Sequence, residues 1–232
     1  LLEQYGVGRV LCLRFGSALA EMEAEDFISA IIVKGLAVRH LVVGDDFRFG
    51  HGRRGDFAML EHSGKRAGFD VENTHTYIYN NVRVSSTRIR DALAAGHLEE
   101  AAHLLDRTYA ISGKVAHGKK RGREWGFPTA NLPLGKRRPP LTGIFTVSVK
   151  GLGSAPVPGV ASVGTRPVVN GRDTILEVHL LDFDQEIYGK RISVEFLRKQ
   201  REEADFPSVA ALIAQISRDK REAERFFAAA AR

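Results

Sequence analysis

The spacing of apolar positions changes character near residue 107. Before that point, short apolar runs, of which residues 9–15 and 39–44 are the clearest, alternate with segments of helical spacing. In residues 24–36 the large apolar side chains recur on one helical face, and Gly35 is placed to end the helix. Strands that alternate with helices predict an α/β fold, Rossmann-like, with a mostly parallel sheet covered by helices.

After residue 107, short alternating runs are separated by Gly and Pro, which predicts an antiparallel barrel or sandwich. The expected strands are residues 109–118, 143–151, 157–167, 175–183 and 191–199. An amphipathic helix is expected over residues 208–228, with Leu212 and Ile216 on its buried side. The length of 232 residues favours two domains. We place them at residues 1–107 and 108–232.

Composition narrows the protein class only moderately. With 44% hydrophobic and 27% charged residues, the chain is typical of ordinary soluble proteins. A formal charge of +6 favours anionic ligands without choosing between nucleotides and nucleic acids. Cys12, the single cysteine, excludes an internal disulfide. There is neither a membrane-length apolar run nor a signal-peptide pattern. We therefore expect a cytoplasmic protein, a monomer or weak oligomer, with no membrane partner.

A basic, aromatic, glycine-rich loop follows the apolar run that ends at Gly44. Ligands bind outside the carboxyl ends of parallel strands, so this loop is well placed for a site. Its arginines attract phosphates and its phenylalanines offer flat faces to a ring. A plain surface loop whose Gly and Asp make turns explains the pattern equally well. The side chains concerned are Phe47, Arg48, Phe49, Arg53 and Arg54.

A second candidate site opens the helix expected after residue 84. The hydroxyls of Ser85, Ser86 and Thr87 suit the N-terminus of a helix, where they cap free backbone N–H groups. The same N–H groups and the helix dipole attract anions. Arg90 lies three residues after Thr87 and so shares its helical face. Capping alone is the simpler interpretation of these residues.

The segment from Gly113 to Leu132 is rich in glycine and in positive charge. Its glycines match neither the Walker nor the dinucleotide fingerprint. Gly118 and Gly122, around Lys119 and Arg121, are suited to present N–H groups and charge to a polyphosphate. A plain basic hairpin is the alternative.

Thr129 and Asn131 are two residues apart, so on an extended backbone both side chains point to the same side. A hydroxyl and an amide oxygen suit a hard cation such as Mg²⁺, which keeps waters and phosphates as its other ligands. Pro128 fixes the backbone before them. Alternatively, Asn131 and Pro133 make a turn.

Glu177 and His179 share one face of the strand expected at 175–183, opposite the apolar Leu176, Val178 and Leu180. An acid that faces a pocket from a strand can act as a general base toward an alcohol. Solvent exposure is the ordinary alternative for a strand glutamate.

The first half resembles the adenylyltransferase domain of bacterial bifunctional riboflavin kinase/FAD synthetases. The resemblance is carried by VVGDDFRFGHGRRGD and VSSTRIRDAL. It implies that Ser85, Ser86, Thr87 and Arg90 contact ATP phosphates. It also implies that Gly44, Asp46, Phe47, Arg48, Phe49 and Gly50 help form a nucleotide and flavin pocket. The early Gly-x-His-x-Gly-His motif of that family does not occur in this chain. We expect it to precede Leu1 and adenylylation to need it.

The second half resembles riboflavin kinase from about Tyr109 to Phe227. The resemblance is carried by GFPTANL, PPLTGIFTVSV, GVASVGTRPVVNG and LEVHLLDFDQEIYGKRISVEFLRKQREE. It implies a six-stranded antiparallel barrel with a C-terminal helix, Mg²⁺ and phosphate binding by Thr129 and Asn131, and Glu177 as catalytic base. The residues that it places around ATP are Gly113, Lys114, His117, Gly118, Lys119, Arg121, Gly122, Phe127, Pro128, Thr129 and Asn131.

The resemblance implies two activities of FMN and FAD biosynthesis, with riboflavin, FMN and ATP as ligands, Mg²⁺ as the metal and no nucleic-acid partner. We interpret Trp125 and Phe127 as packing rather than ligand contacts. Three alternatives stay open at this point. The first half could be a non-catalytic nucleotide-binding module. The barrel could bind nucleic acid through the basic patches 119–123 and 136–138. The protein could also be a flavin carrier without turnover.

Overall fold

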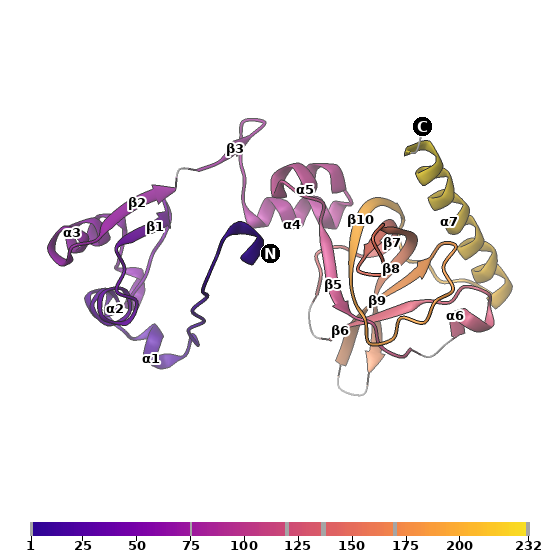
Figure 1. The fold of residues 1–232 in the computed structure, drawn as a ribbon, viewed down its shortest axis with the longest axis horizontal. Helices are drawn as coiled ribbons and strands as arrows, with labels where there is room; N and C mark the ends of the chain where they lie inside the picture. The colour runs from indigo at the N-terminus through magenta and orange to yellow at the C-terminus, as the bar shows by residue number, and fades with distance from the viewer. Residues whose placement is uncertain (1, 75, 119–120, 136–137, 169–170, 231–232) are drawn as a thin grey trace. The chain divides into compact units, whose positions relative to one another are not determined.

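A computed structural model describes residues 2–74, 76–118, 121–135, 138–168 and 171–230. These residues form two compact units, Leu1–Arg83 and Val84–Arg232, whose elements are labelled in Figure 1. In chain order the elements are the 3₁₀ helix η1 (Glu3–Tyr5), α1 (Ser17–Ala20), α2 (Ala24–Phe27), the π-helix η2 (Ile28–Gly35), β1 (His40–Gly44), the 3₁₀ helix η3 (His51–Arg53), α3 (Phe57–Ala67), β2 (Asp70–Thr74), β3 (Ile78–Tyr79), β4 (Val82–Arg83), α4 (Ser86–Ala95), α5 (Leu98–Leu105), β5 (Ala110–Lys114), α6 (Arg121–Glu124), β6 (Ala130–Gly135), β7 (Gly143–Lys150), β8 (Val157–Val168), β9 (Gly171–Leu180), β10 (Arg191–Arg201) and α7 (Val209–Ala230).

The first unit is built on two parallel strands. β1 pairs with β2 in register from His40 opposite Asp70 to Gly44 opposite Thr74. Apolar side chains from α2, η2, β1 and α3 pack together and form the core of the unit. Helix α3 begins where the Asp56 carboxylate accepts a hydrogen bond from the N–H of Met59, at 2.9 Å. The expected parallel α/β arrangement is therefore confirmed for these elements.

The prediction of a strand at residues 9–15 is wrong. These residues adopt no regular secondary structure, and the side chains of Val10, Leu11, Leu13 and Phe15 are exposed. An apolar run becomes a strand only when another strand completes its hydrogen bonds. Within the described part of the chain, β1 and β2 pair with each other and not with this run.

The second unit contains a six-stranded antiparallel sheet in the order β5-β10-β7-β8-β9-β6. The chain beyond β5 returns to the far edge, where the N–H of Ala116 donates to the carbonyl of Asn131 at 2.8 Å. This bridge brings the two edges together, so the sheet curls into a near-barrel. The predicted barrel is confirmed.

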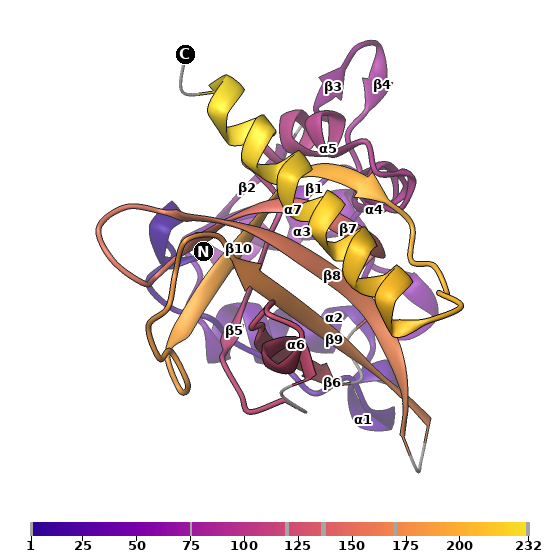
Figure 2. The same ribbon diagram turned by 90° about the vertical axis from the view of Figure 1, so that its right-hand side faces the viewer.

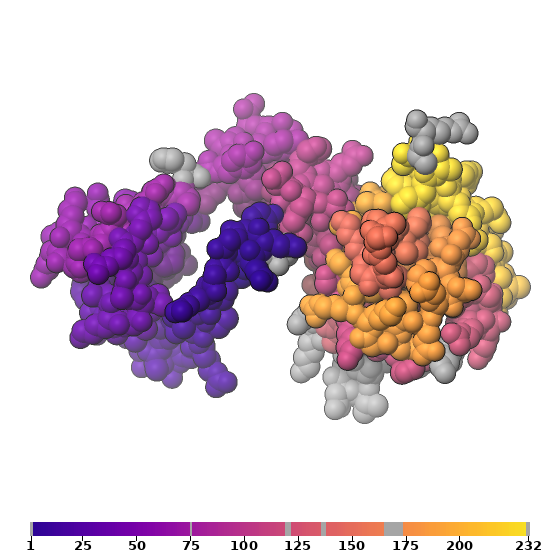
Figure 3. Space-filling view, viewed as in Figure 1, coloured from indigo at the N-terminus to yellow at the C-terminus, as the bar shows by residue number. Residues whose placement is uncertain are grey.

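The barrel interior is filled from alternate positions along each strand, as the two-residue period of a strand requires. Phe145, Leu176, Val178 and Phe196 are all fully buried there. Helix α7 lies across the outside of the barrel, against β7 and β8 (Figure 2). Its atoms form part of the molecular surface, in yellow in Figure 3. The predicted C-terminal helix is thus also confirmed, and its position leaves the outer face of β9 and β6 beside it.

Helices α4 and α5 belong to the compact unit of the barrel. Leu93, Leu98 and Ala101 are buried in the same apolar cluster as the barrel interior. The compact units thus divide at residue 83, before these two helices. The bounds 1–107 and 108–232 stay a prediction about domains. None of the described helices is long and apolar enough to cross a bilayer.

Candidate active site

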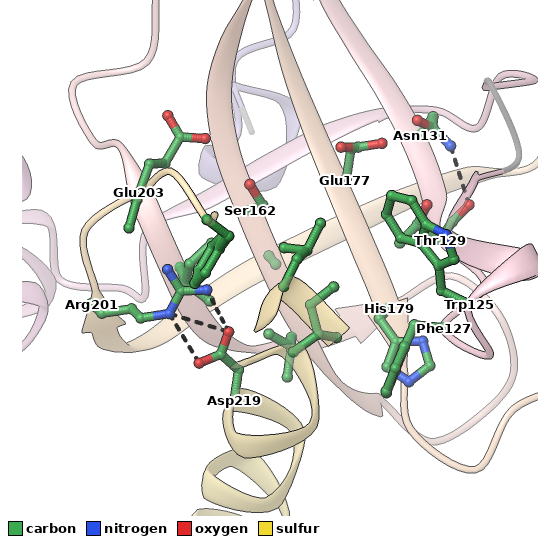
Figure 4. A pocket seen from close by; sticks show the side chains of 18 residues that line it. Trp125, Phe127, Thr129, Asn131, Ser162, Glu177, His179, Arg201, Glu203 and Asp219 are labelled. Carbon is green, nitrogen blue, oxygen red and sulfur yellow. Dashed lines mark hydrogen bonds and ion pairs between the residues drawn. The ribbon is translucent and has the colours of Figure 1, made fainter. Parts of the chain in front are cut away.

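A cavity of about 400 Å³ lies on the outer face of the barrel, between the sheet and α7 (Figure 4). Its lining combines a group of polar side chains with an apolar group from the sheet and the helix. The lining residues are Gly122, Trp125, Phe127, Thr129, Asn131, Ile144, Val160, Ala161, Ser162, Glu177, His179, Arg201, Glu203, Ala204, Phe206, Leu212, Ile216 and Asp219.

The strand register explains why distant residues meet in this cavity. Glu177 of β9 is paired with Asn131 of β6 on one side and with Ser162 of β8 on the other. Ser162 in turn faces Ile144 of β7, and Ile144 faces Arg201 of β10. Residues that are paired across antiparallel strands project from the same face of the sheet. These five side chains, which we call the cross-strand row, therefore line the cavity together.

The alternation predicted around Glu177 is confirmed. Leu176, Val178 and Leu180 are buried in the barrel, whereas Glu177 and His179 lie on the other face and line the cavity. Glu177 is half-buried rather than fully exposed to solvent. Its role as a general base stays a prediction.

Thr129 and Asn131 lie on the same side at the polar end of the cavity, as predicted (Figure 4). Asn131 is only 6% exposed, and its Nδ2 donates to the carbonyl oxygen of Thr129 at 3.2 Å. The Oδ1 of Asn131 is buried and accepts no hydrogen bond from any described group. A buried acceptor without a donor is costly, and a hard cation would satisfy it. The hydroxyl oxygen of Thr129 and the Oδ1 of Asn131 therefore fit a Mg²⁺ ion.

Two glycines let the preceding loop lie directly against these groups. A Cβ atom at Gly118 would come within 2.4 Å of the Asn131 amide nitrogen, and one at Gly122 within 2.4 Å of the carbonyl oxygen of Phe127. Any other residue would push the loop away from the polar end. Lys119 lies outside the described residues, as does the side chain of Arg121.

The other residues predicted around ATP are more scattered. Gly113 and Lys114 belong to the β5–β10 ladder and do not line the cavity. The centroid of the His117 ring lies 3.9 Å from the centroid of the Tyr188 ring. Gly118 and Tyr188 line a small hollow of about 30 Å³ that also touches Pro128, Thr129 and Asn131. Their binding roles stay predictions.

His179 anchors the segment that carries Thr129. Its Nδ1–H donates to the carbonyl oxygen of Pro128 at 2.9 Å, and its ring meets the edge of Phe127 at 5.5 Å between centroids. Burial lowers the pKa of His179, while the bond to Pro128 acts in the opposite direction. A largely neutral imidazole thus holds the backbone next to Thr129 in place. The sequence placed His179 beside Glu177 but gave it no role.

The opposite end of the cavity is closed by an ion pair that the sequence did not reveal. Arg201 of β10 donates from Nε and Nη2 to the carboxylate of Asp219 of α7, at 2.6–3.2 Å. Asp219 is 4% exposed and accepts a further bond from Gln215, at 2.8 Å. A signal was present, because Asp219 falls on the buried stripe of the predicted helix, three residues after Ile216.

Glu203 is a second carboxyl group at the cavity. It follows β10 and lies near the hydroxyl of Ser162, and a Cβ atom at Gly164 would come within 2.1 Å of its carboxylate. Burial raises the pKa of Glu203, Arg201 lowers it, and the nearby Glu177 raises it further. Neither Ser162 nor Glu203 was identified from the sequence, because their proximity depends on the strand register.

Trp125 and Phe127 both line the cavity. The interpretation of these rings as packing alone is therefore incomplete. Phe127 does pack, against His179, but both side chains border the space that a ligand would fill.

The loop after β1 closes on its own unit. Phe49 is only 7% exposed, with its ring 5.6 Å from that of Phe47 and 5.4 Å from that of Phe27. Arg83 binds both Asp45 and Asp46, at 3.4 and 3.1 Å. The ring of Phe49 is thus a core contact in this structure. The binding roles of Gly44, Asp46, Phe47, Arg48, Phe49 and Gly50 stay predictions.

The capping interpretation is confirmed for Ser85, whose hydroxyl accepts from the N–H of Arg88 at 3.2 Å. Ser86, Thr87 and Arg90 lie exposed at the start of α4. The first turn of the helix is therefore accessible, and its phosphate-binding role stays a prediction.

Comparisons with known proteins find matches to both parts of the chain. The family model for riboflavin kinase matches residues 105–227, and the family model for FAD synthetase matches residues 1–88. The bifunctional riboflavin kinase/FMN adenylyltransferase of Escherichia coli strain K12 is 49% identical over 97% of this chain and 72% of that protein. The protein of the same name from Pseudomonas fluorescens is 49% identical over 92% of this chain and 69% of its own length.

One solved structure also matches both units. It is described as a macrolide-efflux protein from Streptococcus pneumoniae, is 31% identical and has a TM-score of 0.79. The match covers 96% of this chain and 72% of that one.

Proposed function

The chain belongs to the bifunctional riboflavin kinase/FMN adenylyltransferase family, whose enzymes make FMN and FAD, and we propose how its residues carry out the two reactions. In the barrel, the γ-phosphate of ATP is transferred to the 5′-hydroxyl of riboflavin, which gives FMN and ADP. The observation that carries this assignment is the cross-strand row, which places the buried acceptor of Asn131 next to Glu177 in one cavity.

Phosphoryl transfer depends mainly on positioning and on the neutralisation of charge. In this proposal Thr129 and Asn131 hold Mg²⁺, which supplies positive charge to the phosphate oxygens when it is bound. The unsatisfied Oδ1 of Asn131 supports the assignment, since a cation would complete its coordination. His179 fixes the backbone of Pro128 and thereby the position of Thr129.

Glu177 acts as the general base. It accepts the proton of the 5′-hydroxyl while that oxygen forms its bond to the γ-phosphorus, and the bond to the β–γ bridging oxygen breaks to release ADP. Glu177 is suited to this step because it is half-buried at the cavity and lies between Asn131 and Ser162 in the register.

The glycine-rich loop lies along the polyphosphate. Gly118 and Gly122 permit its close approach to Asn131 and Phe127, and backbone N–H groups there would face the phosphates. Lys119 and Arg121 are assigned charge-neutralising roles on the same loop. Gly113, Lys114 and His117 extend the proposed ATP site.

The second reaction joins FMN and ATP to give FAD and pyrophosphate. We assign the nucleotide and flavin pocket to the loop at residues 44–50, and phosphate contacts to Ser85, Ser86, Thr87 and Arg90. The accessible first turn of α4 supports the phosphate contacts, because free N–H groups and a positive dipole end attract anions.

The test is incubation of the chain with riboflavin, ATP and Mg²⁺, followed by chromatography for FMN and FAD. We expect FMN to accumulate and its formation to stop when EDTA removes the metal. Folded protein that forms no FMN would overturn the kinase assignment. FMN without FAD would assign the first unit to nucleotide binding without adenylylation.

A further inference from the structure

The cross-strand row gives the distance between the reacting hydroxyl and the apolar part of the cavity, which the phosphate acceptor of the proposed kinase reaction must span. Neighbouring strands are spaced by about 4.8 Å. Glu177 lies on β9, Ser162 one strand away on β8, and Ile144 a further strand away on β7. The reacting hydroxyl must be at Glu177. The apolar lining of Ile144, Phe206 and α7 therefore begins about 10 Å away along the row.

A flavin with a polyol side chain can span this distance, and only one orientation suits the lining of the cavity. Its terminal hydroxyl lies at Glu177 and its ring system lies in the apolar part, near Phe206 and Leu212. The hydroxyls in the middle of the polyol chain must then pass over β8. The polar groups that the structure places there are the hydroxyl of Ser162 and the carboxyl of Glu203 (Figure 4).

Glu203 is held over β8 by its surroundings. Gly164 leaves room for its carboxyl group, which a Cβ atom would displace. Arg201, two residues earlier, is fixed by the ion pair with Asp219, so the start of the loop is tied to α7. Both side chains are exposed, but Glu203 lines the cavity, whereas the adjacent Glu202 pairs with Lys199 and does not line it. One of two neighbouring glutamates is thus directed into the cavity.

The reaction itself does not require this second carboxyl group. Glu177 is the base, and Thr129 and Asn131 carry the oxygens for the metal. A carboxyl beside a serine hydroxyl offers acceptors and a donor, which suits a chain of alcohol groups. A site that hydrogen-bonds a substrate hydroxyl also rejects analogues that lack it, since its own polar groups are then left unpaired.

We propose that Ser162 and Glu203 bind the middle hydroxyls of the acceptor's polyol chain and thereby determine the specificity of the kinase for that chain. The inference rests on the proposed kinase function. It adds two residues that neither touch the phosphate donor nor exchange the transferred proton.

The experiment compares two acceptors that share the flavin ring and the terminal hydroxyl. One is riboflavin, and the other is an isoalloxazine with a 5-hydroxypentyl chain, which lacks the middle hydroxyls. We expect the full chain to prefer riboflavin in kcat/KM by on the order of 10²-fold. In Glu203→Ala and Ser162→Ala this preference should shrink at least tenfold. Glu202→Gln, the matched control, should retain it.

Outcomes for the inference and for the function can be told apart. A wild-type chain that phosphorylates riboflavin, with the same preference in both variants, would overturn the inference and leave the function intact. A wild-type chain that forms no FMN would overturn both. If Glu203→Ala does not fold, Glu203→Gln and Ser162→Ala carry the test, and unchanged preference in both has the same meaning.

Discussion

The two ends of the barrel cavity differ in whether their buried polar groups have partners within the protein. At the β6–β9 end, the Oδ1 of Asn131 is buried without a donor among the described residues, and a glycine-rich loop lies against it. At the α7 end, the buried carboxylate of Asp219 is matched by Arg201 and Gln215. At the first end a buried hydrogen-bond acceptor has no donor among the described residues. At the second end the buried carboxylate has its hydrogen-bond and charge partners within the protein.

This difference indicates that the β6–β9 end binds a ligand and that the ion pair at the α7 end stabilises the fold. Unmet polar groups are expensive in a folded protein and are retained where a ligand completes them. A satisfied ion pair instead fixes the position of a helix. Substitutions at the β6–β9 end should therefore affect chemistry with little effect on folding, and those that break the Arg201–Asp219 ion pair should mainly affect folding. The predictions below test this separation.

Glu177→Gln should have the largest effect on turnover. Loss of a general base reduces the rate by about 10²- to 10⁴-fold, and the amide retains the shape of the side chain. We expect kcat for FMN formation to fall by that amount while the midpoint of thermal unfolding stays close to that of the wild type. Glu195→Gln on β10, whose carboxylate pairs with Lys150 away from the cavity, is the matched control. Equal kcat in wild type and Glu177→Gln would remove Glu177 from the catalytic role.

Asp219→Ala should have the largest effect on stability. It leaves Arg201 without its partner in a mostly buried position, which costs about 3–5 kcal/mol of unfolding free energy. Glu224→Gln on the same helix breaks a more exposed pair with Lys220 and should cost about 0–1 kcal/mol. Urea denaturation of the three proteins measures both values. Similar losses in the two variants would show that the ion pair at the α7 end has no special structural role.

Thr129→Ala should weaken the use of Mg·ATP. Loss of one oxygen near a charged group is worth about 1.5–3 kcal/mol, so the KM for Mg·ATP should rise about tenfold or more. The KM for riboflavin should change far less. Thr142→Ala, at an exposed position outside the cavity, is the control. A KM for Mg·ATP that is the same in both variants would argue against a metal at Thr129, and Asn131→Asp provides an independent check.

His179 should make a smaller contribution, which depends on pH, to the free energy of unfolding. Burial lowers its pKa in the folded state below the ordinary value near 6.5. The unfolded chain therefore binds the proton more readily, and the free energy of unfolding falls as the pH drops below about 6.5. His179→Gln should lose this part of the pH dependence. Denaturation at about pH 7.5 and about pH 5.5 tests it; an identical pH dependence in both proteins would contradict the assignment.

The sequence was sufficient for features that depend on local periodicity. The alternation of residues 175–180 placed Glu177 on the correct face, and the spacing of Thr129 and Asn131 placed both on one side. The same approach failed at residues 9–15, because an apolar run contains no information about whether a partner strand is present. It also missed Ser162, Glu203 and Arg201, whose meeting depends on register across several strands.

The most direct test of this account is a crystal structure of the chain with riboflavin and Mg·ADP. We predict the flavin ring between the sheet and α7, near Phe206, with the ribityl chain over Ser162 and the 5′-hydroxyl beside Glu177. We also predict Mg²⁺ bound to the side-chain oxygens of Thr129 and Asn131. A flavin bound outside the cavity, or bound with its ring at Glu177 and its hydroxyls toward Phe206, would contradict the account.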